Sequence, residues 1–155
     1  MINNDILRRV RYALNINDSA MIEIFKLADY QMTLPELVSL LKKEDEPGFA
    51  ECNDKIMEHF LNGLIYSKRG KIEPKPGQEN KPAAALSNNT ILKKFRVALE
   101  LKEEDMLEIM QLSDMAVSKS ELSALFRKEG HKNYKECGDQ FLRNFIKGLT
   151  IRYRS

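Results

Sequence analysis

The sequence predicts an all-α protein, built as a tandem duplication of a four-helix unit with about eight helices in total. Residues 3–70 align with residues 88–155 at a constant offset of 85 positions, without a gap and with 24 identities in 68 pairs. Apolar residues recur at helical spacing in both halves, and no segment alternates as a strand would. Two halves this similar share one fold, so we expect them to dock through their apolar faces around a pseudo-two-fold axis.

The chain divides into a first helical repeat (1–70), a Pro/Gly-rich linker (71–87) and a second helical repeat (88–155). The linker contains three prolines, which remove backbone donors and disfavour helix in the preceding residue. A unit of about 70 residues is marginal when it folds alone. We therefore expect the repeats to be two halves of one compact domain rather than two independent domains.

Local signals set the expected starts of the helices. Asn4 and Asn89 precede the first apolar stripe of each repeat and are expected N-caps. The third helix of each repeat opens with a capping-box sequence, at Thr33 and again at Ser118. The fourth helix has a glycine in its middle, Gly63 or Gly148, at a cost of about 1 kcal/mol against alanine. The repetition of that cost predicts a close helix–helix contact at this position.

Composition limits the classes of function. The chain is 43% hydrophobic and 31% charged, and no apolar run approaches the roughly 20 residues of a membrane span. The N-terminal residues do not follow the pattern of a secretory signal, so we expect a cytoplasmic protein without a membrane partner. The net charge of +2 divides into −2 for residues 3–70, +1 for 71–87 and +3 for 88–155. This is not the strongly basic balance of a dedicated nucleic-acid binder.

Several segments together resemble a known family. They are residues 4–14 (NDILRRVRYAL), residues 43–49, residues 60–65 (FLNGLI) and residues 131–145 (HKNYKECGDQFLRNF). In this combination they resemble the bacterial conserved-hypothetical family of YehS-like duplicated helical proteins, whose function is unknown. The resemblance spans nearly the whole chain. It implies a duplicated helical fold and assigns no catalytic or binding residue.

Residues that commonly carry catalysis are few. Cys52 and Cys137 occupy equivalent repeat positions and are expected to be buried free thiols, without a second ligand at metal spacing. His59 and His131 are not equivalent and are expected on the surface. No phosphate-binding glycine loop, metalloprotease motif or nucleophile elbow is present. We therefore expect a protein that is not an enzyme and holds no metal or cofactor.

Repeated basic residues are the best candidates for a binding site. Three cations lie on the polar face of each first helix, where they predict two equivalent patches for the phosphates of nucleic acid. A solvated helix face is the plainer interpretation of the same pattern. A protein–protein adaptor is the alternative function, and an enzyme of unknown type is the least favoured one. The oligomeric state and the choice between DNA and RNA stay open. The candidate nucleic-acid-binding residues are Arg8, Arg9, Arg11, Lys93, Lys94 and Arg96, extended by Lys147, Arg152 and Arg154.

Overall fold

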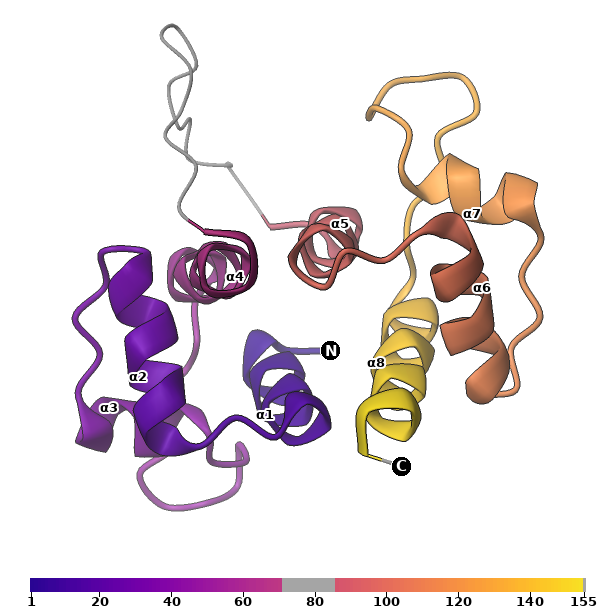
Figure 1. The fold of residues 1–155 in the computed structure, drawn as a ribbon. Helices are drawn as coiled ribbons and strands as arrows, with labels where there is room; N and C mark the ends of the chain where they lie inside the picture. Colours follow the sequence, from indigo (N-terminus) through magenta and orange to yellow (C-terminus); the bar gives the residue numbers. More distant parts are fainter. Residues whose placement is uncertain (71–85, 155) are drawn as a thin grey trace, which may run out of the picture.

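The computed structural model describes residues 1–70 and 86–154, which form eight α-helices and no strand (Figure 1). This confirms the all-α class and the tandem duplication. Of the expected linker, 71–85 lie outside the described residues. The first repeat contains α1 (Asn3–Leu14), α2 (Asp18–Leu27), α3 (Leu34–Leu40) and α4 (Asp54–Arg69). The second repeat contains α5 (Asn88–Ala98), α6 (Glu103–Leu112), α7 (Lys119–Leu125) and α8 (Asp139–Arg154).

The first helix of each repeat packs against the last helix of the other repeat. α1 lies along α8, and α5, the counterpart of α1, lies along α4, the counterpart of α8. Within each repeat, the second helix packs on the last one, α2 on α4 and α6 on α8. Figure 1 shows α1, α4, α5 and α8 in the centre, with α2 and α3 at one end and α6 and α7 at the other. Reciprocal contacts of this kind are what a two-fold relation between the repeats produces.

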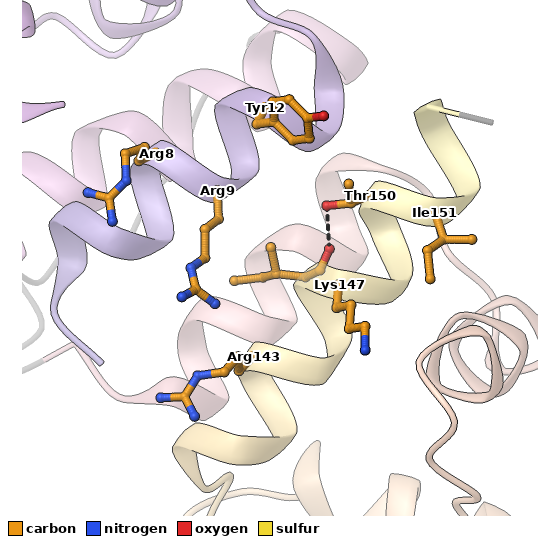
Figure 2. Close-up of a pocket in the computed structure, with 8 residues that line it drawn as sticks. Arg8, Arg9, Tyr12, Arg143, Lys147, Thr150 and Ile151 are labelled. Carbon is orange, nitrogen blue, oxygen red and sulfur yellow. Dashed lines mark hydrogen bonds between the residues drawn. The ribbon is translucent and has the colours of Figure 1, made fainter. Parts of the chain in front are cut away.

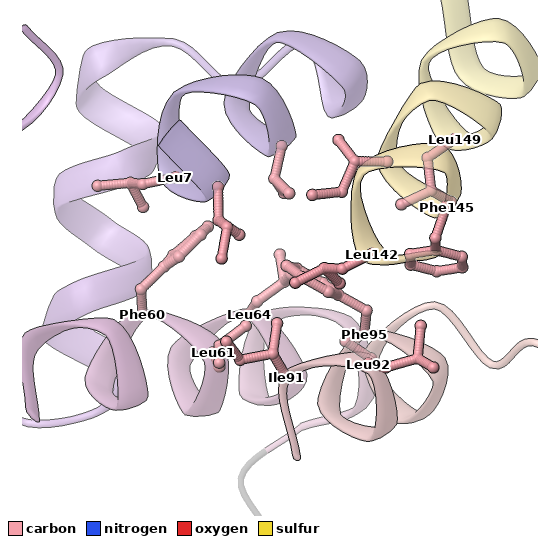
Figure 3. Close-up of a cluster of buried hydrophobic side chains, with 14 of the residues drawn as sticks. Leu7, Phe60, Leu61, Leu64, Ile91, Leu92, Phe95, Leu142, Phe145 and Leu149 are labelled. Carbon is pink, nitrogen blue, oxygen red and sulfur yellow. The ribbon is translucent and has the colours of Figure 1, made fainter. Parts of the chain in front are cut away.

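The hydrophobic core is continuous through both repeats. Phe60 of α4, Phe95 of α5 and Phe145 of α8 are fully buried, and the rings of Phe95 and Phe145 lie 6.3 Å apart between centroids. Figure 3 shows leucines and phenylalanines from α1, α4, α5 and α8 meeting in one cluster. Burial of apolar surface is the main favourable term in folding, so we expect the shared core to stabilise the two repeats together.

A buried asparagine ties each first helix to the loop before the last helix of its own repeat. α1 begins at Asn3, so the expectation that Asn4 is an N-cap is wrong; its side chain is fully buried. The Nδ2 of Asn4 donates to the carbonyl oxygens of Leu40 (2.9 Å) and Ala50 (2.8 Å). Its Oδ1 accepts from the backbone N–H of Cys52 at 2.9 Å. One amide thus satisfies three backbone groups that have no helical partner.

Asn89 repeats this arrangement in the second half of the chain. It donates to the carbonyl oxygens of Leu125 and Lys135, both at 2.9 Å, and accepts from the N–H of Cys137 at 2.8 Å. The N-cap of α5 is instead Ser87, whose hydroxyl accepts from the N–H of Thr90. Asn89 was also expected as an N-cap, and that expectation is wrong for the same reason as for Asn4.

The capping hydroxyls of the third helices are where the sequence places them. The side chain of Thr33 accepts from the N–H of Glu36 at 3.3 Å, and the side chain of Ser118 accepts from the N–H of Glu121 at 3.1 Å. The carboxylate of Glu36 accepts a hydrogen bond from the hydroxyl of Tyr30, which joins the start of α3 to the end of α2. The bonds of Thr33 and Ser118 satisfy N–H groups that a helix leaves free in its first turn.

The mid-helix glycines confirm the expected close contact. A Cβ atom added at Gly63 of α4 would lie 1.9 Å from the carbonyl oxygen of Ile24 in α2. A Cβ at Gly148 of α8 would lie 2.1 Å from the carbonyl oxygen of Ile109 in α6. Both distances are far below van der Waals contact with a backbone atom that has little freedom to move. Glycine is therefore required where the second and fourth helices of each repeat cross.

We expect Gly63→Ala to lower the free energy of unfolding by about 1–3 kcal/mol, because α2 must shift to admit the methyl group. This collision outweighs the roughly 1 kcal/mol that alanine gains in a helix. Gly138→Ala is the matched control, since nothing lies within 4 Å of the added Cβ. Urea unfolding followed by circular dichroism measures both. Equal stability of the two variants would contradict the tight crossing.

Candidate functional site

A groove of about 460 Å³ lies between α1 and α8, so each repeat supplies one wall (Figure 2). Its volume is in the range of ligand pockets in proteins. Four of the lining side chains are cationic and none is acidic. The lining residues are Arg8, Arg9 and Tyr12 from α1, and Arg143, Ile146, Lys147, Thr150 and Ile151 from α8.

The lining residues differ between the two ends of the groove. Figure 2 shows Arg9 extending from α1 towards α8, at the end where Arg143 also lies. Tyr12 and Ile151 lie further along the two helices, at the other end. The Thr150 hydroxyl donates to the carbonyl oxygen of Ile146 at 3.0 Å, so it is used within its own helix. The groove therefore has Arg9 and Arg143 at one end and Tyr12 and Ile151 at the other, with Lys147 between Arg143 and Ile151 on α8.

Three of the four groove cations have no ion-pair partner in the described part of the chain: Arg9, Arg143 and Lys147, all of them exposed. Arg8 differs, because its Nη2 lies 2.7 Å from Oδ1 of Asp5. The nearest acidic side chain on α8 is Asp139, one turn before Arg143. The N-terminal ammonium lies 2.7 Å from it, and this hydrogen bond is the main cause of its lowered pKa, to which Arg143 also contributes.

The equivalent position between α4 and α5 is different in charge. Arg143 and Lys147 are replaced there by Glu58 and Asn62, and Tyr12 by Val97. Lys94, the counterpart of Arg9, is half-buried and donates to Oδ1 of Asn62 at 2.6 Å. Burial lowers the pKa of Lys94, and the charge of Glu58 opposes that shift. The two basic faces are thus not equivalent, contrary to the expectation from the sequence.

Arg11 and Arg96 stabilise the turn after each first helix. Their Nε atoms donate to the carbonyl oxygens of Ile16 (2.9 Å) and Leu101 (3.1 Å). Arg11 also pairs with Asp18, and the guanidinium of Arg96 lies 4.6 Å from the ring centroid of Phe126. The Nε bond to a backbone carbonyl, repeated in both halves, gives the two arginines a structural role. Neither lines the groove.

The remaining predicted cations are spread over three places. Lys93 is exposed and lines a separate hollow between α5 and the segment after α7. Arg152 pairs with Asp105 of α6 at 3.2 Å, on the far side of α8. Arg154 borders the groove: its Nη1 donates to the carbonyl oxygen of Tyr12 at 2.9 Å, and its guanidinium lies 4.0 Å from the centroid of that ring. The structure therefore brings Arg8, Arg9, Lys147 and Arg154 together and leaves the others apart.

Sequence reasoning missed Arg143 and Tyr12. Arg143 lies one turn before Lys147 on α8, a spacing that places both side chains on one helix face. That signal was present in the sequence, although it acquires meaning only when α8 is known to pack beside α1. Tyr12 has no counterpart of its type in the second repeat, where Val97 stands. The loss of symmetry at these positions was the available clue.

The residues that could carry catalysis are held in structural roles. Cys52 and Cys137 are buried and free, as expected. Burial, helped by the carboxylates of Asp54 and Asp139, raises the pKa of the Cys52 thiol from the ordinary 9.0 to about 12 and that of the Cys137 thiol to about 11. Among the described residues, no three His, Cys, Asp or Glu side chains are grouped to hold a metal ion.

The two histidines have different surroundings. His59 was expected on the surface, and this is wrong: it is half-buried, its Nδ1 lies 2.9 Å from the carbonyl oxygen of Ala28, and its ring lies 5.3 Å from that of Tyr30. His131 is exposed as expected, and its Nδ1 accepts from the N–H of Asn133. Within 1–70 and 86–154, no helix is both long and apolar enough to cross a membrane.

We expect both native thiols to react slowly with iodoacetamide up to pH 9. At pH 8, a pKa near 12 leaves about one Cys52 thiolate in ten thousand, and a pKa near 11 leaves about one Cys137 thiolate in a thousand. The same protein in urea is the control, and its thiols should react at the rate of an ordinary cysteine. Mass spectrometry of the alkylated peptides separates the two sites. Fast reaction of Cys137 below pH 7, with Cys52 inert, would instead indicate an activated nucleophile.

Comparison with known proteins places this architecture in a family. The family model described as "Protein of unknown function (DUF1456)" matches residues 3–70 and again residues 88–155. The uncharacterized protein YehS of Escherichia coli (strain K12) is 46% identical over 152 residues, which cover 98% of this chain and 96% of that protein. No solved structure matches the chain. The chain belongs to the DUF1456 family, whose model it matches once in each helical repeat.

Proposed function

We propose that the protein is a non-catalytic binding module for nucleic acid, which it contacts at the phosphate backbone through the groove between α1 and α8. The observation that carries this proposal is the set of three exposed cations, Arg9, Arg143 and Lys147, that face one groove without an ion pair in the described residues. Like charges held together without a counter-ion favour an anionic ligand. The planar guanidinium of arginine matches the oxygen geometry of phosphate in particular.

The modest net charge of the chain agrees with a local site. A groove with three or four phosphate contacts needs no strongly basic protein, and it gives moderate rather than steep salt dependence. The non-catalytic part of the proposal is supported by the buried thiols with raised pKa values and by His59, whose ring nitrogen is bound to a backbone carbonyl. We further propose that the protein acts in the cytoplasm, where nucleic acid is accessible.

An adaptor for a protein partner is the second candidate function. Leu34 and Val38 lie one turn apart on α3 and are 49% and 43% exposed. The second repeat has Lys119 and Ser123 at the same positions, so this apolar pair is found once. An adaptor that used it would bind its partner with little dependence on salt. Nucleic acid is favoured because Arg9, Arg143 and Lys147 have no ion-pair partner among the described residues, whereas two exposed apolar side chains are ordinary on a protein surface.

The variant Arg9→Ala/Arg143→Ala/Lys147→Ala should bind oligonucleotides roughly 10-fold more weakly at low salt. Its affinity should also fall less steeply with salt: the slope of log affinity against log salt concentration should decrease in magnitude by about 2, because three phosphate contacts are lost. Fluorescence anisotropy with a labelled oligonucleotide measures both quantities. Arg11 and Arg96 are left intact, since their replacement would disturb the turns that they hold.

The matched control is Lys26→Ala/Lys119→Ala/Lys132→Ala, which removes the same net charge from exposed positions that do not line the groove. It should retain most of the affinity and most of the salt slope. Equal losses in the two triple variants would show a diffuse electrostatic attraction. Unchanged binding by the groove variant would exclude the groove as the site.

A further inference from the structure

The aromatic ring of Tyr12 borders the groove and is already held in place on one face. Its side chain is 58% exposed, although it lies at the junction of the two repeats. Arg154 covers one side of the ring, with its guanidinium carbon 4.0 Å from the centroid and its Nη1 bound to the Tyr12 carbonyl oxygen. A ring fixed from one side loses little conformational freedom when a second flat group stacks on it. The cation also holds the ring by a cation–π contact.

The spacing of the groove residues fits a phosphate beside a flat apolar group. Arg9 and Tyr12 are three residues apart on α1, which is about 4.5 Å along the helix axis. On α8, Arg143 and Ile151 are eight residues apart, about 12 Å along the axis, and Lys147 lies between them (Figure 2). A ligand that spans the groove therefore needs an anionic part and a planar, apolar part directly beside it. A nucleotide unit has both.

We propose that the ligand is single-stranded nucleic acid, with one base stacked on Tyr12 and the neighbouring phosphate bound by Arg9 and Arg143. This inference rests on the proposed function and specifies its substrate class. In a duplex, the faces of the bases are covered by their neighbours, and only their edges are accessible in the grooves. In a single strand the faces are free, and stacking on an aromatic side chain beside cationic contacts is a common mode of binding.

The equivalent position between α4 and α5 differs at the residues on which this inference rests. Val97 replaces Tyr12, Glu58 replaces Arg143, and Lys94 is bonded to Asn62. One chain should therefore bind one short oligonucleotide at the stacking site rather than two. The duplicated fold thus serves as a scaffold, and the groove between α1 and α8 carries the recognition.

The first test compares a single-stranded oligonucleotide with its own duplex on the intact protein. The single strand should bind more tightly, and Tyr12→Ala should weaken it by roughly 5- to 100-fold while leaving weak duplex binding unchanged. Tyr12→Phe should keep the affinity, because it keeps the ring. Tyr153→Ala is the control, since Tyr153 is 44% exposed on α8 and does not line the groove.

A second test detects the stack itself. The chain contains no tryptophan, so Tyr12→Trp introduces the sole indole and reports from the groove alone. Single-stranded oligonucleotide should quench its emission on binding, whereas an abasic oligonucleotide of equal length should bind through its phosphates with little quenching. Equal affinity for duplex and single strand, with Tyr12→Ala neutral, would overturn the inference and leave the proposed function standing. If neither form binds, both fail.

Discussion

The packing of each first helix on the last helix of the other repeat is the constraint on which the molecule depends. Because α1 lies on α8 and α5 on α4, neither repeat completes its own core, and the buried cluster runs through both. The same exchange creates the candidate site, since one wall of the groove comes from the first repeat and the other from the second. The contact between α1 and α8 is therefore part of the fold and also forms the proposed binding site.

The two repeats share the residues that hold each of them together and differ on their surface. Asn4 and Asn89 make the same three hydrogen bonds, and Gly63 and Gly148 meet the same carbonyl position. The groove residues differ instead: Arg143, for example, aligns with Glu58. Residues that satisfy buried backbone groups have few substitutes, whereas exposed side chains are free to diverge. The difference between the two repeats thus lies at the groove residues, where a ligand would bind.

Much of the fold was predictable from the sequence because it rests on local signals. The apolar stripes, the hydroxyl caps at Thr33 and Ser118 and the meaning of the two glycines follow from helix geometry. Asn4 was misassigned because an asparagine near a helix start favours an N-cap locally, and its true partners are more than 30 residues away. The groove was missed in part because it depends on which helices meet across the repeats. Sequence spacing alone showed cations on α1 and α8 but not that they face each other.

Separate expression of residues 1–70 and 88–155 tests this mutual dependence most directly. Each fragment alone exposes the apolar face that its partner should cover, so we expect it to melt without cooperativity or to self-associate. An equimolar mixture should give a one-to-one complex by analytical ultracentrifugation, with a single cooperative thermal transition. A monomeric fragment that melts cooperatively on its own, and gains nothing from the other, would contradict the account.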